Sequence, residues 1–217
     1  MTRPAMIATI GLAVLVAVAA PAAAQSGGSA GAIEVAAGGL YMNRSPLTSG
    51  DAKETTPTGA SFSLFSTSTT LSAMTGGELH VGVYLSRHLE LFGAASFGSR
   101  QLRLEATNDT ENAAALTATE RLQQFTFTGG ALWLLSESRV APFLSAEAGQ
   151  LRQLHEDKTL VESGLVYMAG AGVNMRVTER GSAGLRLAGR AVVRSKQFLL
   201  DTKKVSPAVG VSVFVRF

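Results

Sequence analysis

Apolar and polar residues alternate along most of this chain, and the alternation predicts β-strands. Runs with a period of two start near residue 32 and continue almost to the last residue, whereas the helical period of about 3.6 is hard to find. Successive side chains of a strand point to opposite faces, so each run defines the two faces of one strand. The pattern predicts eight long strands, over residues 32–43, 75–85, 89–104, 121–135, 140–152, 163–177, 182–194 and 205–217.

The connections between these strands alternate between short and long. The short ones are polar and have the composition of tight turns. Short turns at one end of a sheet and long loops at the other are typical of membrane β-barrels. The short connections are residues 86–88, 136–139 and 178–181, and the long ones are about 44–74, 105–120, 153–162 and 195–204.

One face of every predicted strand carries no charged residue. In the strand 182–194, Arg186, Arg190 and Arg194 share one face, and the other face is apolar. An arginine at the lipid midplane costs roughly 2–4 kcal/mol, so we expect the charge-free faces to contact lipid. The sheet then closes, because an open edge in hydrocarbon leaves backbone groups unpaired. The polar residues expected to face inward are Glu34, Glu78, His80, Glu90, Glu147, Asn174, Arg176, Arg186, Arg190 and Arg216.

Small residues on the inward faces indicate a narrow interior. Eight strands enclose a space just wide enough to be filled by side chains, so we expect no wide aqueous channel. The sequence therefore predicts an all-β protein, an eight-stranded antiparallel up-and-down transmembrane β-barrel over residues 32–217. Its inward glycines are Gly38, Gly82, Gly130, Gly170, Gly172, Gly184 and Gly210, beside the large Phe92, Phe143 and Phe214.

The first 24 residues have the order of a secretory signal peptide. Arg3 precedes an apolar run over residues 5–20, and Pro21 is followed by three alanines before Gln25. An uncleaved membrane anchor is the alternative, but a spanning helix needs roughly 20 apolar residues. The absence of cysteine excludes lipoprotein processing at this site. Residues 25–31 are rich in Gly and Ser, and we expect them to form a flexible N-terminal tail.

The amino-acid composition excludes several kinds of functional site. The sequence has no cysteine, which excludes a disulfide scaffold, a cysteine-ligated metal and a thiol nucleophile. Nineteen basic residues barely outnumber 16 acidic ones among 217 residues, which gives a formal charge of +3. No polycationic face follows from this balance, so we do not expect nucleic acid as a partner.

The C-terminal strand carries a resemblance to a known family. Its apolar residues alternate and the chain ends in phenylalanine, which resembles the β-signal that the barrel-assembly machinery reads in bacterial outer-membrane proteins. Together with the signal peptide, residues 32–217 resemble small eight-stranded outer-membrane barrels such as the OmpA transmembrane domain and OmpX-type proteins. The resemblance implies the outer membrane of a Gram-negative-type bacterium, with lipid and lipopolysaccharide as surroundings, and it implies a scaffold rather than a chemistry. The residues at the hydrophobic positions of this assembly signal are Val209, Val211, Val213, Val215 and Phe217. Aromatic residues for an outer girdle are few, and the main candidates are Tyr41, Tyr84 and Trp133.

Charged residues on the inward faces predict ion pairs inside the barrel. Buried charges need partners, and the two signs are balanced here. Counting along the strands, with both termini in the periplasm, places Glu34, Glu90, Arg176 and Arg216 toward the periplasmic end. A lumen plugged by ion pairs is what the resemblance to the OmpA barrel implies. The candidates expected near mid-barrel are Glu78, His80, Glu147, Arg186 and Arg190.

A catalytic site, rather than a set of ion pairs, is the alternative interpretation of the same residues. Glu78 and His80 are two positions apart, and a histidine oriented by a carboxylate can activate a serine. The family of outer-membrane lipid A deacylases uses such a set, but its catalytic groups face lipid, and no His-x-Ser motif is present here. We therefore predict that the protein is not an enzyme; unchanged lipid A acylation in a strain lacking it would agree. Three scattered histidines make no recognisable metal site, and no cofactor is expected.

The predicted function is a structural or surface-interaction role. The long loops 44–74 and 105–120 would face the cell exterior, and the strand pair formed by 100–104 and 121–124 would protrude there. An extracellular ligand could bind to its edge or to the loops. A narrow gated pore for small solutes is the alternative, and it requires the Glu–Arg pairs to rearrange. A lipid-modifying enzyme is third, and a soluble lipocalin-like barrel, which needs a polar exterior, is the alternative fold.

Overall fold

The structure is a computed structural model that describes residues 30–55, 59, 61–107, 115–155, 161–178, 182–195 and 205–217. The predicted signal peptide, residues 1–24, and residues 25–29 of the predicted tail lie outside the described residues. Within the described part of the chain, no helix is long and apolar enough to cross a membrane.

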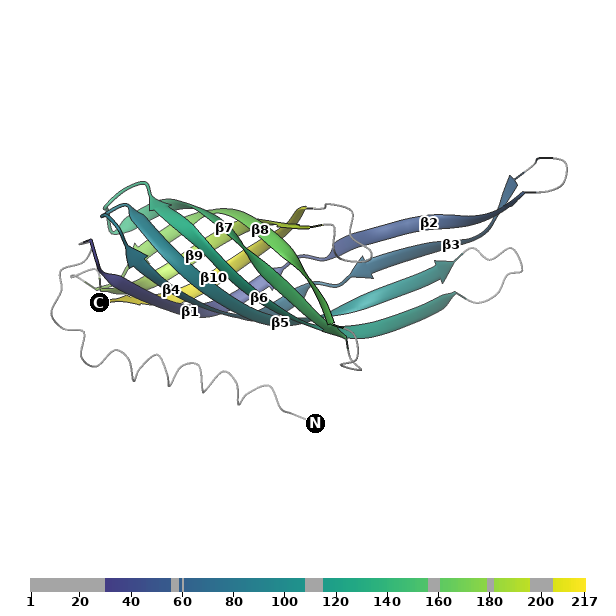
Figure 1. Ribbon diagram of the computed structural model, residues 1–217, viewed down its shortest axis with the longest axis horizontal. Helices are drawn as coiled ribbons and strands as arrows, with labels where there is room; N and C mark the ends of the chain where they lie inside the picture. The colour runs from purple at the N-terminus through teal and green to yellow at the C-terminus, as the bar shows by residue number, and fades with distance from the viewer. Residues whose placement is uncertain are drawn as a thin grey trace, which may run out of the picture.

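Strands account for nearly all of the described residues. Each hydrogen-bonded pair is antiparallel, and the sheet order is β2-β3-β5-β4-β1-β10-β9-β8-β7-β6, with β6 also paired to β5. That last pairing closes β1 and β4 to β10 into an eight-stranded barrel (Figure 1), so the predicted fold is confirmed. The strands are β1 (Ile33–Met42), β2 (Ser45–Thr55), β3 (Ser61–Leu71), β4 (Met74–Tyr84), β5 (Leu89–Thr107), β6 (Leu116–Leu134), β7 (Val140–His155), β8 (Val161–Arg176), β9 (Ala183–Arg194) and β10 (Val205–Arg216).

Two strands occupy the segment that the sequence predicted as the loop 44–74. β2 and β3 pair with each other, and residues 66–71 of β3 pair with the end of β5 over residues 102–107. β5 and β6 also run past their predicted ends at 104 and 121, so that these four strands project beyond the barrel (Figure 1). The sequence analysis missed β2 and β3 because polar residues occur on both of their faces, which leaves no sustained apolar alternation to detect.

The apolar face of each barrel strand points outward, as predicted. Leu79, Trp133 and Val211 expose 50%, 57% and 54% of their surface, whereas Glu34 exposes 0%. No described outward residue in this band, which runs around all eight barrel strands, is charged. Tyr84 departs from expectation: the sequence suggested an outer aromatic girdle of Tyr41, Tyr84 and Trp133, but Tyr84 shares its parity with Glu78 and His80 and is buried in the lumen.

The outward face changes from apolar to polar where the strands leave the barrel. On β5 the outward residues change from Phe97 to Ser99, Gln101 and Arg103, while inward Leu102 joins a buried cluster with other leucines. The same change occurs on β6 and β7. A lipid-facing surface therefore ends at this level, and a water-facing surface begins. The leucines clustered on the inner side are Leu47, Leu71, Leu102 and Leu122.

Inward glycines make room for the large side chains of the lumen. Gly172 lies against the ring of Phe143, and Gly184 lies against the ring of Phe214. A Cβ at Gly172 would overlap the carbonyl oxygen of Leu187 and would lie 2.5 Å from Cζ of Phe143. The barrel interior is packed like a protein core, and it holds its bulky residues only because the facing positions are small.

We predict that Gly172→Ala destabilises the barrel by about 1–3 kcal/mol, because the added methyl group overpacks the lumen. Gly189→Ala is the matched control, since it lies on the adjacent strand, faces outward and has its nearest atom 3.9 Å from the added Cβ. Urea denaturation of each variant refolded in detergent micelles measures the difference. Equal midpoints for the two variants would contradict the packed lumen.

Candidate functional site

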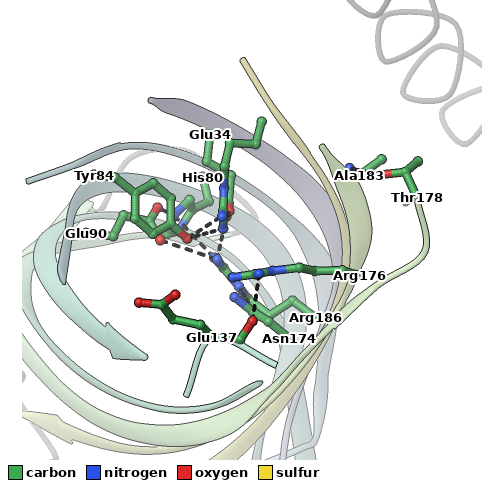
Figure 2. A network of polar contacts seen from close by, with 11 residues as sticks. Glu34, His80, Tyr84, Glu90, Glu137, Asn174, Arg176, Thr178, Ala183 and Arg186 are labelled. Atoms are coloured by element: carbon green, nitrogen blue, oxygen red, sulfur yellow. Dashed lines mark hydrogen bonds and ion pairs between the residues drawn. The ribbon is translucent and has the colours of Figure 1, made fainter. Parts of the chain in front are cut away.

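Arg186 of β9 is at the centre of a buried polar layer inside the barrel (Figure 2). Nη2 of Arg186 donates to Oε1 of Glu34 and lies 3.4 Å from Oε2 of Glu90. Its Nε donates to Oδ1 of Asn174 over 2.9 Å. The guanidinium therefore joins residues from β1, β5 and β8 across the lumen.

Glu34 also has a second guanidinium beside it. Nη2 of Arg216 lies 2.9 Å from Oε2 of Glu34 and 2.5 Å from the hydroxyl oxygen of Tyr84. The Tyr84 hydroxyl donates to the same Oε2 over 3.0 Å. Glu34 is fully buried, yet both its oxygens accept charged or hydroxyl donors, which is the condition under which a buried carboxylate is tolerated.

His80 completes this layer. Its Nε2 lies 2.6 Å from Oε1 of Glu90 and 3.3 Å from Nη1 of Arg186, and its ring stacks on Phe92 with centroids 4.3 Å apart. An ionised carboxylate only accepts, so the 2.6 Å contact is a hydrogen bond that Nε2 of His80 donates to Glu90. Two carboxylates, of Glu34 and Glu90, face two guanidiniums, of Arg186 and Arg216.

Aromatic rings enclose the two arginines. The guanidinium carbon of Arg186 lies 5.6 Å from the ring centroid of Phe143 and 5.8 Å from that of Phe214. That of Arg216 lies 4.0 Å from the ring centroid of Tyr84. Ring faces attract cations at these distances and exclude water from the ion pairs. We call this set of contacting side chains the lower layer; it comprises Glu34, His80, Tyr84, Glu90, Asn174, Arg186 and Arg216.

A second layer surrounds Arg190 of β9. Its guanidinium donates twice to Glu78, once over 2.7 Å, and its Nε lies 3.5 Å from Oε1 of Glu147. Thr128 donates to the other oxygen of Glu147 over 3.0 Å. A cavity of about 10 Å³ adjoins these residues, which is the space of roughly one water molecule. This upper layer has two carboxylates and one guanidinium, so its charge is not balanced by the residues named.

A third group of polar side chains lies inside the barrel, and of its members the sequence analysis had noted only Arg194. Arg100 donates to Oε1 of Gln124 over 2.6 Å and approaches the sulfur of Met42 at 3.3 Å. Gln153 donates to the same Gln124 oxygen over 3.3 Å, and Arg194 approaches the Met42 sulfur at 3.5 Å. Strand parity alone could have found these residues, because each shares a face with an inward residue of its strand.

The five residues that the sequence predicted to form ion pairs near mid-barrel are divided between the two layers. It brings Glu78, Glu147 and Arg190 together in the upper layer. It places His80 and Arg186 in the lower layer with Glu34 and Glu90, which counting along the strands had assigned to a different depth. Strand tilt and the reach of arginine account for the regrouping, since residues at one level come from different positions along tilted strands.

The lower layer also contains the one described group of side chains with the donor set of a metal site. Ligand atoms of Glu34, His80 and Glu90 lie within 4.8 Å of one another. The two guanidiniums already occupy these carboxylates, and a cation placed there would be repelled by both. The donor set fits ion pairing better than metal binding.

The C-terminal strand closes the barrel against β1. Val213 is paired with Ala37 and Val211 with Gly39, and the backbone of Phe217 exchanges hydrogen bonds of 2.8 and 3.1 Å with Ile33. The predicted assembly-signal residues lie on the outward parity of β10, and Val209, Val211 and Val213 are exposed there. Recognition by the assembly machinery stays a prediction.

Several solved structures share the fold of this chain. No family model and no curated protein matches the chain. The outer membrane protein OprG from Pseudomonas aeruginosa matches 88% of this chain and 98% of its own, with a TM-score of 0.58 and 11% identity. Neisserial surface protein A matches 86% and 97%, with a TM-score of 0.53 and 14% identity. Outer membrane protein AlkL, solved in lipid bilayers, matches 90% and 94%, with a TM-score of 0.50 and 12% identity.

These structural matches show the architecture of the chain, and sequence identities this low show nothing more specific. The chain has the fold of the small eight-stranded outer-membrane barrels, as its resemblance to OmpX-type proteins implied.

Proposed function

We propose that this chain is an integral outer-membrane protein whose lumen is closed by ion pairs and whose projecting strands form an interaction surface outside the cell. The observation that carries the proposal is the lower layer, in which Glu34, Glu90, Arg186 and Arg216 are all buried and paired across the lumen. The outward apolar band supports insertion into lipid, and the solved counterparts with the same fold are outer-membrane proteins.

Because the ion pairs of the lower layer are buried, opening the lumen would be energetically unfavourable. Solute passage through the lower layer would require Arg186 to leave Glu34, Glu90 and Asn174 together. Separating a buried pair leaves uncompensated charge in a low-dielectric space, which is strongly unfavourable. We infer that the barrel acts as a scaffold rather than as a conduit.

The projecting strands supply the surface for interaction. β2, β3 and the ends of β5 and β6 make a four-stranded sheet beyond the level where the outward face becomes polar. Its outer face carries Ser49, Ser68, Glu105 and Thr117 in one register row. Such a surface is hydrated and rich in hydrogen-bonding groups, which suits reversible recognition of a polar extracellular ligand.

A narrow gated pore is the second candidate, and the upper layer is what favours it. There, two carboxylates share one arginine next to a small cavity, so this layer is less tightly balanced than the lower one. A solute that passed the upper layer would still have to cross the lower layer.

We predict that the purified barrel in planar lipid bilayers gives no conductance steps, and that Arg190→Ala gives none either, because the lower layer still closes the lumen. Current recordings on the two proteins test this directly. Steps that appear on removal of Arg190 would favour the gated pore and contradict the closed scaffold.

We predict that Arg186→Ala lowers the free energy of unfolding by about 3–5 kcal/mol, because Glu34 and Glu90 are left buried without their shared partner. Arg87→Ala is the control: its side chain is 72% exposed and lies 3.8 Å from Glu137, so about 0–1 kcal/mol is expected. Urea denaturation in detergent micelles measures both. Equal losses would mean that the lower layer does not stabilise the barrel.

A further inference from the structure

The upper layer of the lumen carries more negative than positive charge. Glu78 and Glu147 provide two carboxylates, and Arg190 provides the guanidinium that contacts both of them. Both terminal nitrogens of Arg190 donate to Glu78. Its Nε lies 3.5 Å from Oε1 of Glu147 and makes no hydrogen bond to a described residue. The charge of Glu147 is therefore poorly compensated, although only 2% of its side chain is exposed.

Oxygen atoms from four strands meet in this layer. Glu78 of β4, Ser96 of β5 and Thr126 of β6 are cross-strand neighbours in one register row. Glu147 reaches the same level from β7, where the Thr128 hydroxyl donates to its Oε2 over 3.0 Å. All five residues line the cavity of about 10 Å³ that lies beside Arg190. The cavity is therefore bordered by carboxylates and hydroxyls on one side of the lumen.

Two of these side chains have a polar atom without a hydrogen bond. Thr126 exposes only 4% of its surface, and its hydroxyl makes no side-chain hydrogen bond within the described part of the chain. Oε1 of Glu147, unlike its Oε2, accepts no hydrogen bond from a described residue. Buried polar atoms are rarely left unpaired. Because both residues line the cavity, a ligand that satisfies them must fit a space of roughly one water molecule.

The charge of the layer decides which ligand of this size is suitable. A water molecule would fit, but it would leave one buried carboxylate without a counter-charge, which is strongly unfavourable. A monovalent cation supplies exactly one positive charge, and hard cations take oxygen ligands such as carboxylates. A divalent cation would leave the layer with an excess of positive charge. The lower layer has no such excess of carboxylates, since two guanidiniums face its two carboxylates.

We propose that the upper layer binds one monovalent cation of the size of sodium in the cavity beside Ser96, Thr126 and Glu147. The Glu147 carboxylate supplies the charge and the two hydroxyls supply further oxygen ligands, while Arg190 stays paired with Glu78. The ion joins β5, β6 and β7 inside the lumen and stabilises the barrel. This inference goes beyond the proposed function, because it concerns the lumen and holds whatever the projecting strands bind.

The test compares urea unfolding of the mature barrel, refolded in zwitterionic detergent, in sodium chloride and in an equal concentration of choline chloride. Choline keeps the ionic strength and the anion constant but is too large for a cavity of one water molecule. Thr126→Val removes one hydroxyl, and Thr69→Val is its matched control, because Thr69 is a buried threonine of β3 outside this layer. Glu147→Gln removes the charge, and Glu137→Gln makes the same change at an exposed position near Arg87.

We expect the folding equilibrium constant of the wild type to be about tenfold larger in about 0.1 M sodium chloride than in choline chloride, as for a site with a Kd of about 10 mM. Thr69→Val and Glu137→Gln keep this difference, Thr126→Val reduces it, and Glu147→Gln abolishes it.

Equal stability of the wild type in the two salts would overturn the proposal, and it is the result for a cavity that holds only water. The full sodium effect in Glu147→Gln would overturn it as well. If Glu147→Gln does not refold, Thr126→Val decides, because a sodium effect as large as that of Thr69→Val contradicts the site. None of these failures bears on the lower layer, so the proposed closed lumen is tested separately by the conductance recordings.

Discussion

Closure of the sheet is the constraint on which the rest of this structure depends. β1 is hydrogen-bonded to both β4 and β10, and β5 is hydrogen-bonded to β6, so none of the eight barrel strands has an unpaired edge. In hydrocarbon an unpaired backbone group has no water to bond to, and only closure removes that penalty. Once the sheet is closed, each strand has one face toward lipid and one toward a narrow interior. All charge in the membrane-spanning part must then be accommodated inside.

The interior accommodates that charge by pairing it. Arg186 joins Glu34, Glu90 and Asn174 from three other strands, and Arg190 joins Glu78 and Glu147. Small residues on the facing positions let these long side chains and the phenylalanine rings share a small cross-section. The proposed closed state rests on the same packing that pairs these charges, so this structural requirement and the proposed function have one physical origin.

Sequence periodicity predicted the barrel well because lipid imposes a strict rule on one face of every strand. Val209, Val211 and Val213 on β10 follow that rule. β2 and β3 escaped prediction because polar residues, many of them Ser and Thr, occur on both of their faces, so no lipid-facing apolar alternation marks them. Tyr84 was assigned to the outer surface from its residue type, although its parity placed it inside with His80. Pairing between Arg186 and Glu34 could not be predicted from depth along single strands, because tilt and stagger decide which residues share a level.

Electrophoresis of fractionated cells tests most directly whether this chain forms a closed β-sheet barrel in the outer membrane. The outer-membrane fraction is run in SDS without and with boiling, and the protein is detected by antibody. A closed barrel resists SDS until it is heated, so we expect to find the protein in this fraction and expect boiling to slow its migration. Recovery in the soluble periplasmic fraction, with the same mobility before and after boiling, would contradict it.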